Sequence, residues 1–293
     1  MRRILLTGAR GMVGRDFHET LQRQGIDAVG VGREELDITR EPEVDYLLQH
    51  VRPDVLVNCA AYTAVDDCET NREMAHLVNA DAVRYLAEHC NRWGTLLVHF
   101  STDFVFDGTK RSPYETADAV DPLSAYGETK LAGERSAAAA WKHLIIRTSW
   151  VFGPYGRNFV EAIAGQIEKG RDHLRVVDDQ RGRPTYVPHL VGATLRLIDL
   201  AASRDDARGI FHYADLPFCT WFEFAREIVG ELQRRGLAQE GIELEPVTTD
   251  EMPRPARRPA WSVLSTSRYE TETGTAPDLW QLGLLDYFDR RTG

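Results

Sequence analysis

Near its beginning the chain reads Arg3-Ile4-Leu5-Leu6-Thr7-Gly8-Ala9-Arg10-Gly11-Met12-Val13-Gly14, a short apolar run followed by glycines at every third position. The apolar run 4–6 predicts a buried strand that ends before the first glycine. After the turn, Val13, Phe17 and Leu21 recur at the spacing of one helix face. Gly25 stands where a helix C-cap glycine is expected. The stretch therefore predicts a strand, a glycine turn and a helix in that order.

Strand, glycine turn and helix in this order form the first half of a dinucleotide-binding unit. Gly8 permits the tight turn, Gly11 lets the backbone approach a pyrophosphate, and Gly14 lets the helix pack closely on the strand. The first N–H groups of the helix are then free to bind phosphate oxygens. A glycine-rich turn without a ligand is the alternative, but three glycines at this spacing in this context favour a dinucleotide site.

The alternation of apolar strand and amphipathic helix continues through the first half of the chain. Further strands are predicted at 27–31, 54–58, 96–100 and 144–147, and helices at 42–51, at 75–90 and from Tyr126 onward. This pattern predicts an α/β fold, a Rossmann-type doubly wound parallel sheet. Ligands bind beyond the carboxyl ends of such strands, so the relevant loops follow Thr7, Val31, Asn58, Phe100 and Arg147.

The second half is less regular and predicts a smaller C-terminal α/β substrate lobe. We expect helices at 159–170, 187–200 and 220–232 (with Thr220 as an N-cap), strands at 174–177 and 210–213, and an irregular loop at 245–259. The expected dinucleotide-binding domain comprises 1–148, 174–213 and 260–280. The expected substrate lobe comprises 149–173, 214–259 and 281–293.

Composition excludes several classes of protein. The formal net charge of −10 argues against a nucleic-acid surface, which needs a basic face. No apolar run approaches the roughly 20 residues of a membrane span. The chain enters its first strand directly, so we expect no signal peptide. The cysteines lack metal-ligand spacing and are expected as buried free thiols: Cys59, Cys68, Cys90 and Cys219. These features fit a cytoplasmic protein with neither nucleic-acid nor membrane partners.

Two polar clusters fall on or beside the predicted loops. Residues 101–108 (STDFVFDG) follow the fourth strand, and Tyr126-Gly127-Glu128-Thr129-Lys130 opens the next helix. Tyr126 and Lys130 share a helix face, where an ammonium would lower the pKa of a phenol from its usual value of about 10. Tyr126 is therefore a candidate general acid for a carbonyl oxygen, which Thr102 could also hydrogen-bond. Tyr-x-x-x-Lys alone is a common surface pair, but Thr102 and the glycine turn favour the catalytic interpretation.

The glycine turn, Thr102 and the Tyr126–Lys130 pair resemble the extended short-chain dehydrogenase/reductase superfamily. Longer strings look like one branch of it, the dTDP-4-dehydrorhamnose reductases. These strings are 58–66 (NCAAYTAVD), 101–108, 122–134 (PLSAYGETKLAGE), 147–153 (RTSWVFG), 156–159 (GRNF), 178–185 (DDQRGRPT) and 258–264 (RPAWSVL). The resemblance extends from the first strand to near Ser267.

The resemblance implies reduction of the C4 ketone of dTDP-6-deoxy-L-lyxo-4-hexulose (dTDP-4-dehydro-L-rhamnose) to dTDP-L-rhamnose. Hydride would pass from the nicotinamide C4 to the sugar C4, while Tyr126 donates the proton. Lys130 would hold the nicotinamide ribose and tune Tyr126. Thr102 would orient the carbonyl. The substrate lobe would then bind a sugar nucleotide.

The same matching implies binding residues. For the cofactor these are Gly11, Met12 and Val13 at the pyrophosphate, beside Gly8 and Gly14 of the turn, then Asp37 and Ile38 at the adenine, and Ala61, Tyr62 and Thr63 after the third strand. For the sugar nucleotide they are Thr102, Asp103, Trp150 and Asn158. Trp150 as an ordinary core residue is the alternative interpretation.

The residue after the second strand bears on the choice of cofactor. An acid there favours NAD, whereas an arginine favours the 2′-phosphate of NADP. Arg33 stands there with Glu34 and Glu35 just beyond, so we expect NADPH. NADH stays open, because Arg33 could also be a solvated turn residue. One or two of a set of arginines are expected to hold the dTDP diphosphate: Arg181, Arg183, Arg254, Arg257 and Arg258.

Two departures from the family pattern affect the interpretation. Phe104 stands where tyrosine is frequent, and it argues against a nucleotide-sugar 4,6-dehydratase, which needs a second acid after the Thr-Asp pair. The stretch 185–189 lacks a glutamate that some relatives use for a magnesium-bridged dimer, so we expect no metal, and a homodimer stays open. The remaining alternatives are another nucleotide-sugar 4-ketoreductase and a noncatalytic NADP-binding regulatory subunit.

Overall fold

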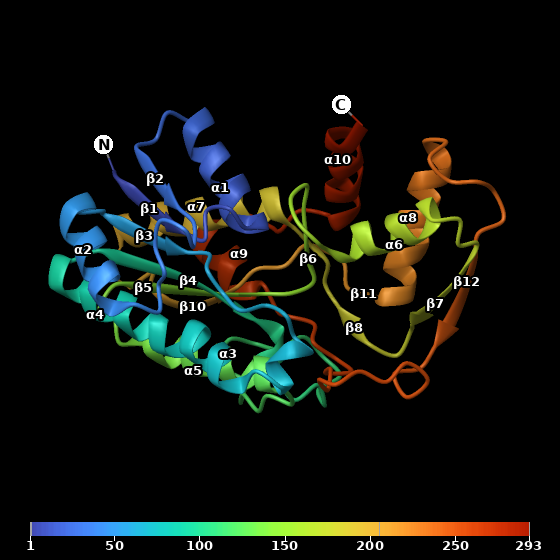
Figure 1. Ribbon diagram of the computed structural model, residues 1–293, viewed down its shortest axis with the longest axis horizontal. Helices are drawn as coiled ribbons and strands as arrows, with labels where there is room; N and C mark the ends of the chain where they lie inside the picture. The colour runs from blue at the N-terminus through green and yellow to red at the C-terminus, as the bar shows by residue number, and fades with distance from the viewer. Residues whose placement is uncertain (1, 205, 293) are drawn as a thin grey trace.

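A six-stranded parallel sheet forms the larger of two parts that lie side by side in the computed structural model, which describes residues 2–204 and 206–292 (Figure 1). The strand order is β2-β1-β3-β4-β5-β10. The strands are β1 (Ile4–Thr7), β2 (Ala28–Val31), β3 (Val55–Asn58), β4 (Leu96–Thr102), β5 (His143–Thr148) and β10 (Gly209–His212). The order reverses between β1 and β3, and ligands of doubly wound sheets bind at such a point.

Helices cover both faces of this sheet, because its strands are apolar on both sides. One face carries α1 (Met12–Arg23), α7 (Val187–Ser203) and α9 (Ser267–Thr273), and the other carries α2 (Glu41–Val51), α4 (Ala82–Trp93) and α5 (Ala125–Ala138) (Figure 1). Ile4 and Leu6 pack on the first face, with Phe17 and Leu21 of α1. Leu5 packs on the opposite face. The predicted doubly wound α/β fold is confirmed.

The helix expected at 75–90 is longer and irregular. It consists of α3 (Arg72–His76), a π-helical turn (Leu77–Asp81) and α4. Such turns often occur at functional sites. Here the turn directs Asn79 at the loop after β3: the Asn79 Oδ1 accepts from the Tyr62 N–H at 2.8 Å, and the Asn79 Nδ2 donates to the Tyr62 carbonyl at 3.0 Å. Helix periodicity in the sequence does not reveal this irregularity.

The smaller part contains helices and short strand pairs around its own core. Its elements are β6 (Val151–Phe152), α6 (Phe159–Glu168), β7 (His173–Val177), β8 (Arg181–Gly182), β9 (Thr185–Tyr186), β11 (Cys219–Thr220), α8 (Trp221–Arg234), β12 (Glu243–Val247) and α10 (Trp280–Thr292). Phe152, Phe224 and Phe288 lie in this core. The predicted N-cap Thr220 is confirmed, and it forms a capping box with Glu223.

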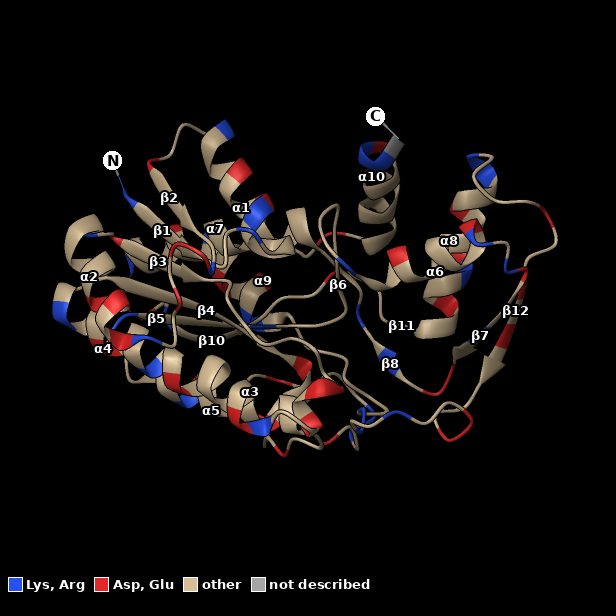
Figure 2. Ribbon diagram, in the orientation of Figure 1, with Lys and Arg blue, Asp and Glu red and all other residues tan. Residues whose placement is uncertain are grey.

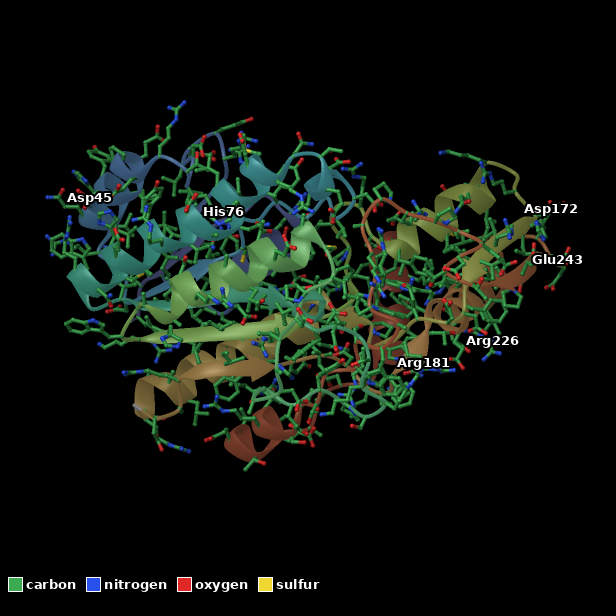
Figure 3. All side chains as sticks on the ribbon, turned by 90° about the horizontal axis from the view of Figure 1, so that it is seen from below. Asp45, His76, Asp172, Arg181, Arg226 and Glu243 are labelled. Carbon is green, nitrogen blue, oxygen red and sulfur yellow. The ribbon has the colours of Figure 1, made fainter. Side chains whose placement is uncertain are left out.

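Two expectations for the second half differ from the structure. Residues 174–177 were expected in the dinucleotide-binding domain, but β7 pairs with β12 and packs Leu174 and Val176 into the smaller core. The loop expected at 245–259 begins as β12, whose Glu243 N–H donates to the Asp172 carbonyl at 2.7 Å at the outer end of the molecule (Figure 3). Pro246 and scattered charges hide this strand in the sequence, whereas its parallel pairing with β7 is visible only in the structure. The division into two domains stays a prediction.

Residues 2–204 and 206–292 contain neither a membrane-spanning helix nor a cluster of metal-binding side chains. No helix there is long and apolar enough to span a bilayer. No group of three or more His, Cys, Asp or Glu side chains there is arranged to hold a metal ion. The four cysteines are free thiols, and Cys59 is only partly buried.

Candidate active site

A cavity of about 1200 Å³ opens between the two parts, at the carboxyl ends of β1, β3, β4 and β5. The larger part contributes the start of α1, the loop after β3 and the end of β4. The smaller part contributes α6, Trp221 and the segment 249–259. Of the predicted site residues, the following line it: Gly11, Met12, Val13, Ala61, Thr63, Thr102, Asp103, Tyr126, Lys130 and Trp150.

The glycine turn is built by close backbone contacts. Gly8 has a φ of +63°, and a Cβ there would lie 2.6 Å from the Ala60 backbone nitrogen. A Cβ on Gly14 would lie 2.3 Å from the Gly8 carbonyl oxygen, so α1 can follow β1 this closely only with glycine. Gly11 is the N-cap of α1 and supplies no side-chain hydrogen bond. Gly11, Met12 and Val13 line the cavity, so the start of α1, where helix N–H groups have no acceptor within the helix, lies at the cavity wall.

Tyr126 and Lys130 occupy the first turns of α5, whose start is set by Ser124. The Ser124 hydroxyl accepts from the Gly127 N–H at 3.3 Å, an N-cap that fixes where the helix begins. Thr102 ends β4, and its hydroxyl donates to the Asp103 carboxylate at 3.1 Å. The Phe104 ring packs edge-on against Tyr126, with centroids 5.5 Å apart. The three predicted catalytic side chains are thus brought to one wall of the cavity.

The expected effect of Lys130 on Tyr126 is wrong for this arrangement. Tyr126 is half-buried in the cavity wall, and desolvation raises the pKa of its phenol, an effect that a hydrogen bond with Thr102 only partly opposes. The Lys130 ammonium instead donates to the Phe100 carbonyl at 2.6 Å. A phenol that stays protonated is suited to donate a proton rather than to accept one.

Two other ionisable groups in the cavity wall are shifted by burial. Desolvation raises the pKa of the Asp103 carboxyl to about 6. Desolvation lowers the pKa of the Lys130 ammonium to about 8, while the charge of Glu134 acts in the opposite direction. Buried ionisable groups with shifted pKa values are typical of functional sites.

Trp150 lines the cavity and has an unusual backbone conformation. Its φ is +47°, a strained value for a residue with a side chain. Its ring stacks on Trp221 with centroids 3.6 Å apart and planes 8° apart. Its edge also lies over Gly182, where a Cβ would meet the ring at 2.4 Å. Sequence reasoning missed Trp221. Its place directly after the N-cap Thr220 was the available signal, but its partner is distant in the chain.

Several predicted residues lie outside the described cavity wall. Gly8 and Gly14 shape the turn, and Tyr62 packs with Tyr126 around Cys68. Asn158 is the N-cap of α6: its Oδ1 accepts from the Glu161 N–H at 3.1 Å, and its Nδ2 donates to the Gly153 carbonyl at 2.9 Å. Its side chain is thus occupied by the backbone, whereas its neighbours Arg157 and Phe159 line the cavity.

The end of β2 holds charges of both signs. The Gly32 N–H donates to the Glu35 carboxylate at 2.9 Å, and Arg10 of the glycine turn forms ion pairs with Glu34 and Glu35. Arg33 is exposed and has no hydrogen bond or ion pair within the described part of the chain. Nearby, the Asp37 carboxylate accepts from the Thr39 hydroxyl at 2.7 Å, and Ile38 is buried in the core.

The arginines considered for a diphosphate differ in their availability. Arg258 is committed to Asp66, with contacts of 2.5 and 2.9 Å, and Arg183 is buried. Arg181 lies on β8 outside the described wall (Figure 3). Arg254 and Arg257 line the cavity on the arginine-rich segment after β12, which is blue in Figure 2. These two are the best placed of the five.

A doubly wound sheet, a glycine turn at its switch point, Thr102 at the end of β4 and a Tyr-x-x-x-Lys pair at the start of α5 define an NAD(P)-dependent oxidoreductase of the short-chain dehydrogenase/reductase class. The family model described as RmlD substrate binding domain matches residues 1–292. The chain belongs to this family, that of the dTDP-4-dehydrorhamnose reductases.

Relatives and solved structures agree over nearly the whole length. A dTDP-4-dehydrorhamnose reductase of Aggregatibacter actinomycetemcomitans is 36% identical, with 97% of each chain covered. A probable dTDP-4,6-dihydroxy-2-methyloxan-3-one 4-ketoreductase of Streptomyces antibioticus is 39% identical, covering 98% of this chain and 94% of the relative. The crystal structure of a dTDP-4-dehydrorhamnose reductase of Bacillus anthracis in complex with NADP superposes with a TM-score of 0.91 at 33% identity, with 99% of each chain covered.

Proposed function

We propose that this protein reduces the C4 ketone of dTDP-6-deoxy-L-lyxo-4-hexulose to dTDP-L-rhamnose with NADPH. The observation that carries the proposal is one continuous cavity that joins the Tyr126 phenol to the uncapped start of α1. The names of the relatives, and the NADP in the similar crystal structure, support the substrate class and the cofactor.

The cofactor would lie along the glycine turn. The N–H groups at Met12 and Val13 would hold its pyrophosphate, since they start α1 without a side-chain cap. Ala61, Tyr62 and Thr63 would lie beside it, with Asp37 and Ile38 near the adenine. Arg33 is exposed at the end of β2 and suited to a 2′-phosphate, while Glu35 could accept a 2′-hydroxyl, so NADH stays an alternative. Bound NADPH supplies the hydride for the sugar C4.

Side chains of the protein would supply the proton that the carbonyl oxygen of the sugar takes up. The Tyr126 Oη would donate its proton to the carbonyl oxygen of the sugar, since burial keeps the phenol protonated. The Thr102 hydroxyl would orient that oxygen from the end of β4. The Lys130 ammonium, which donates to the Phe100 carbonyl at 2.6 Å, would hold the nicotinamide ribose.

The smaller part would bind the rest of the substrate. Trp150, stacked on Trp221, offers an apolar wall for the deoxysugar, and Asp103 a polar contact. Arg254 and Arg257 would pair with the diphosphate, because guanidinium groups suit phosphate oxygens. Asn158 would act indirectly, by fixing the start of α6 beside Arg157.

A second candidate is another nucleotide-sugar 4-ketoreductase, which the Streptomyces antibioticus relative favours. Incubation with NADPH and dTDP-6-deoxy-L-lyxo-4-hexulose distinguishes the candidates. Loss of nicotinamide absorbance with formation of dTDP-L-rhamnose supports the proposal, while a different reduced sugar favours the second candidate. Absence of oxidation with any ketosugar nucleotide would favour a regulatory subunit. Action in the cytoplasm and a homodimer are further predictions, which cell fractionation and sedimentation of the purified protein test.

A further inference from the structure

The loop between β6 and α6, residues 153–158, lies against the start of α1. A Cβ at Gly156 would lie 3.7 Å from the Met12 Cβ, and a Cβ at Gly153 would lie 3.6 Å from the Met12 Cγ. Met12 is the first residue of α1. The loop therefore runs beside this helix N-terminus, although it leads into a helix of the smaller part.

Tyr155 fastens the middle of the loop to α1. Its hydroxyl donates to the Glu19 carboxylate at 2.6 Å. The Arg15 guanidinium, which donates to Glu19 at 3.2 Å, lies 4.1 Å from the centre of the Tyr155 ring. Arg15 and Glu19 are four residues apart and share one face of α1. The Tyr155 side chain thus contacts a carboxylate and a cation of the same helix, and these contacts fix the loop relative to α1.

Asn158 holds the loop from its other end. Its Nδ2 donates to the Gly153 carbonyl at 2.9 Å and to the Gly156 carbonyl at 3.4 Å. Gly156 has a φ of +77°, in the left-handed region that favours glycine. Arg157 therefore extends from a backbone that is fixed on both sides.

Arg157 is placed to meet an anion in the cavity. It is exposed, and it lines the cavity together with the start of α1. Within residues 2–204 and 206–292 its guanidinium has no hydrogen bond or ion pair. By contrast, two arginines near the start of α1 are paired with carboxylates: Arg10 binds Glu35, and Arg15 binds Glu19. Arg157 thus brings a positive charge to this end of the cavity that no carboxylate of the described chain offsets.

The other cations of the cavity wall belong to different parts of it. Arg175 and Arg258 are paired with carboxylates, and Lys130 donates to a backbone carbonyl. Arg254 and Arg257 lie on the segment after β12. Of these wall cations, Arg157 is carried by the loop that contacts the start of α1.

We propose that Arg157 binds the pyrophosphate of the dinucleotide, across from the N–H groups at the start of α1. The helix N-terminus offers only a partial positive charge, whereas a guanidinium forms charge-assisted hydrogen bonds with phosphate oxygens. Tyr155 is a positioning residue, because it holds the loop on α1. The inference deepens the proposed function and rests on it for the presence of NADPH. The smaller part then contributes to cofactor binding as well as to substrate binding.

Nucleotide binding to the purified protein tests this role without any reaction. In Arg157→Met we expect the Kd of NADPH to rise about tenfold, the scale of one lost hydrogen bond to a charged group. The Kd of NADH should rise by the same factor, because both dinucleotides contain the pyrophosphate and only NADPH has the 2′-phosphate. The Kd of dTDP, which carries the diphosphate of the substrate, should stay unchanged. Fluorescence titration measures the reduced dinucleotides, and calorimetry measures dTDP.

Two further variants serve as controls. Arg157→Lys keeps the charge without the planar guanidinium, so the Kd of NADPH should rise by only about threefold. Arg226→Met removes an exposed arginine of α8 and should change none of the three constants. A weaker dTDP complex with unchanged NADPH binding would assign Arg157 to the substrate diphosphate and overturn the inference. A loss confined to NADPH would place Arg157 at the 2′-phosphate and would overturn it as well.

The role of Tyr155 is tested by combining two substitutions. Tyr155→Phe keeps the ring beside Arg15 and removes the hydrogen bond to Glu19. We expect it to raise the Kd of NADPH about threefold when Arg157 is present and to have no effect in the Arg157→Met background, since Tyr155 acts through Arg157. Equal effects in both backgrounds would refute this positioning role.

The inference and the proposed function can fail separately. A protein that binds NADPH through Arg157 but reduces no ketosugar nucleotide would refute the proposed function alone. A protein that reduces the ketosugar, and in which Arg157→Met leaves the Kd of NADPH unchanged, would refute only the role of Arg157.

Discussion

Among single side chains, Tyr126 gives the sharpest test of the chemistry. We expect Tyr126→Phe to keep NADPH affinity and lower kcat by about 100-fold or more, because the ring is retained while the proton donor is lost. Fluorescence titration with NADPH and a steady-state assay measure the two quantities. Turnover at the wild-type rate would dismiss Tyr126 as the acid.

Asp103 tests whether a buried carboxylate of the site lowers the free energy of unfolding. Burial raises the pKa of its carboxyl to about 6 in the folded protein, from 3.8. The folded state therefore binds the extra proton between these values, and this group destabilises the fold as pH rises through 6. We expect Asp103→Asn to raise the free energy of unfolding by about 1 to 3 kcal/mol above that pH. Denaturant titrations measure this, and the gain should vanish below 3.8. A gain that is equal at both extremes of pH would contradict the assignment.

At the level of elements, the junction of β1 and α1 depends on glycine. We expect Gly14→Ala to lower the free energy of unfolding by about 1 to 3 kcal/mol and to weaken NADPH binding, since the new Cβ would lie 2.3 Å from the Gly8 carbonyl oxygen. Gly165→Ala in α6 is the control. A Cβ there meets nothing within 4 Å, so helix propensity alone should stabilise the protein by about 0.5 to 1 kcal/mol. Equal effects of the two substitutions would refute the close approach.

Across the whole molecule, Asp66 ties the two parts together. It follows β3, yet it pairs with Arg258 and accepts from the Ala256 N–H at 3.1 Å, which orders the segment that carries Arg254 and Arg257. We expect Arg258→Met to raise KM for the sugar nucleotide about tenfold, or about 1.4 kcal/mol, with the Kd of NADPH unchanged. Arg226→Met, on an exposed position of α8, should change neither constant (Figure 3). Equal weakening of cofactor and substrate would contradict a role confined to the substrate side.

The sequence predicted what depends on local pattern. Val13, Phe17 and Leu21 mark α1 because helix periodicity is visible within one segment, and Thr220 marks the start of α8 for the same reason. The π-helical turn before α4 escaped prediction, since its determinant is the contact of Asn79 with a distant loop.

Long-range pairings account for the remaining differences. β12 depends on β7, Trp221 on Trp150, and Arg258 on Asp66, and no spacing within one segment reports such partners. The expected lowering of the Tyr126 pKa by Lys130 was wrong for a related reason. The i, i+4 spacing predicts the position of Lys130 on the helix, but it does not predict the burial that raises the pKa of the phenol. The sequence likewise did not predict that the Asn158 side chain caps α6 or that the Arg33 side chain is exposed to solvent.

The most direct test of the proposed reductase follows the transferred atom. The purified protein would be incubated with dTDP-6-deoxy-L-lyxo-4-hexulose and NADPH deuterated at the transferable position of the nicotinamide C4. We predict loss of nicotinamide absorbance and a dTDP-L-rhamnose that carries deuterium at sugar C4. Unchanged absorbance and unreacted ketosugar, in a protein that binds NADPH, would contradict the account.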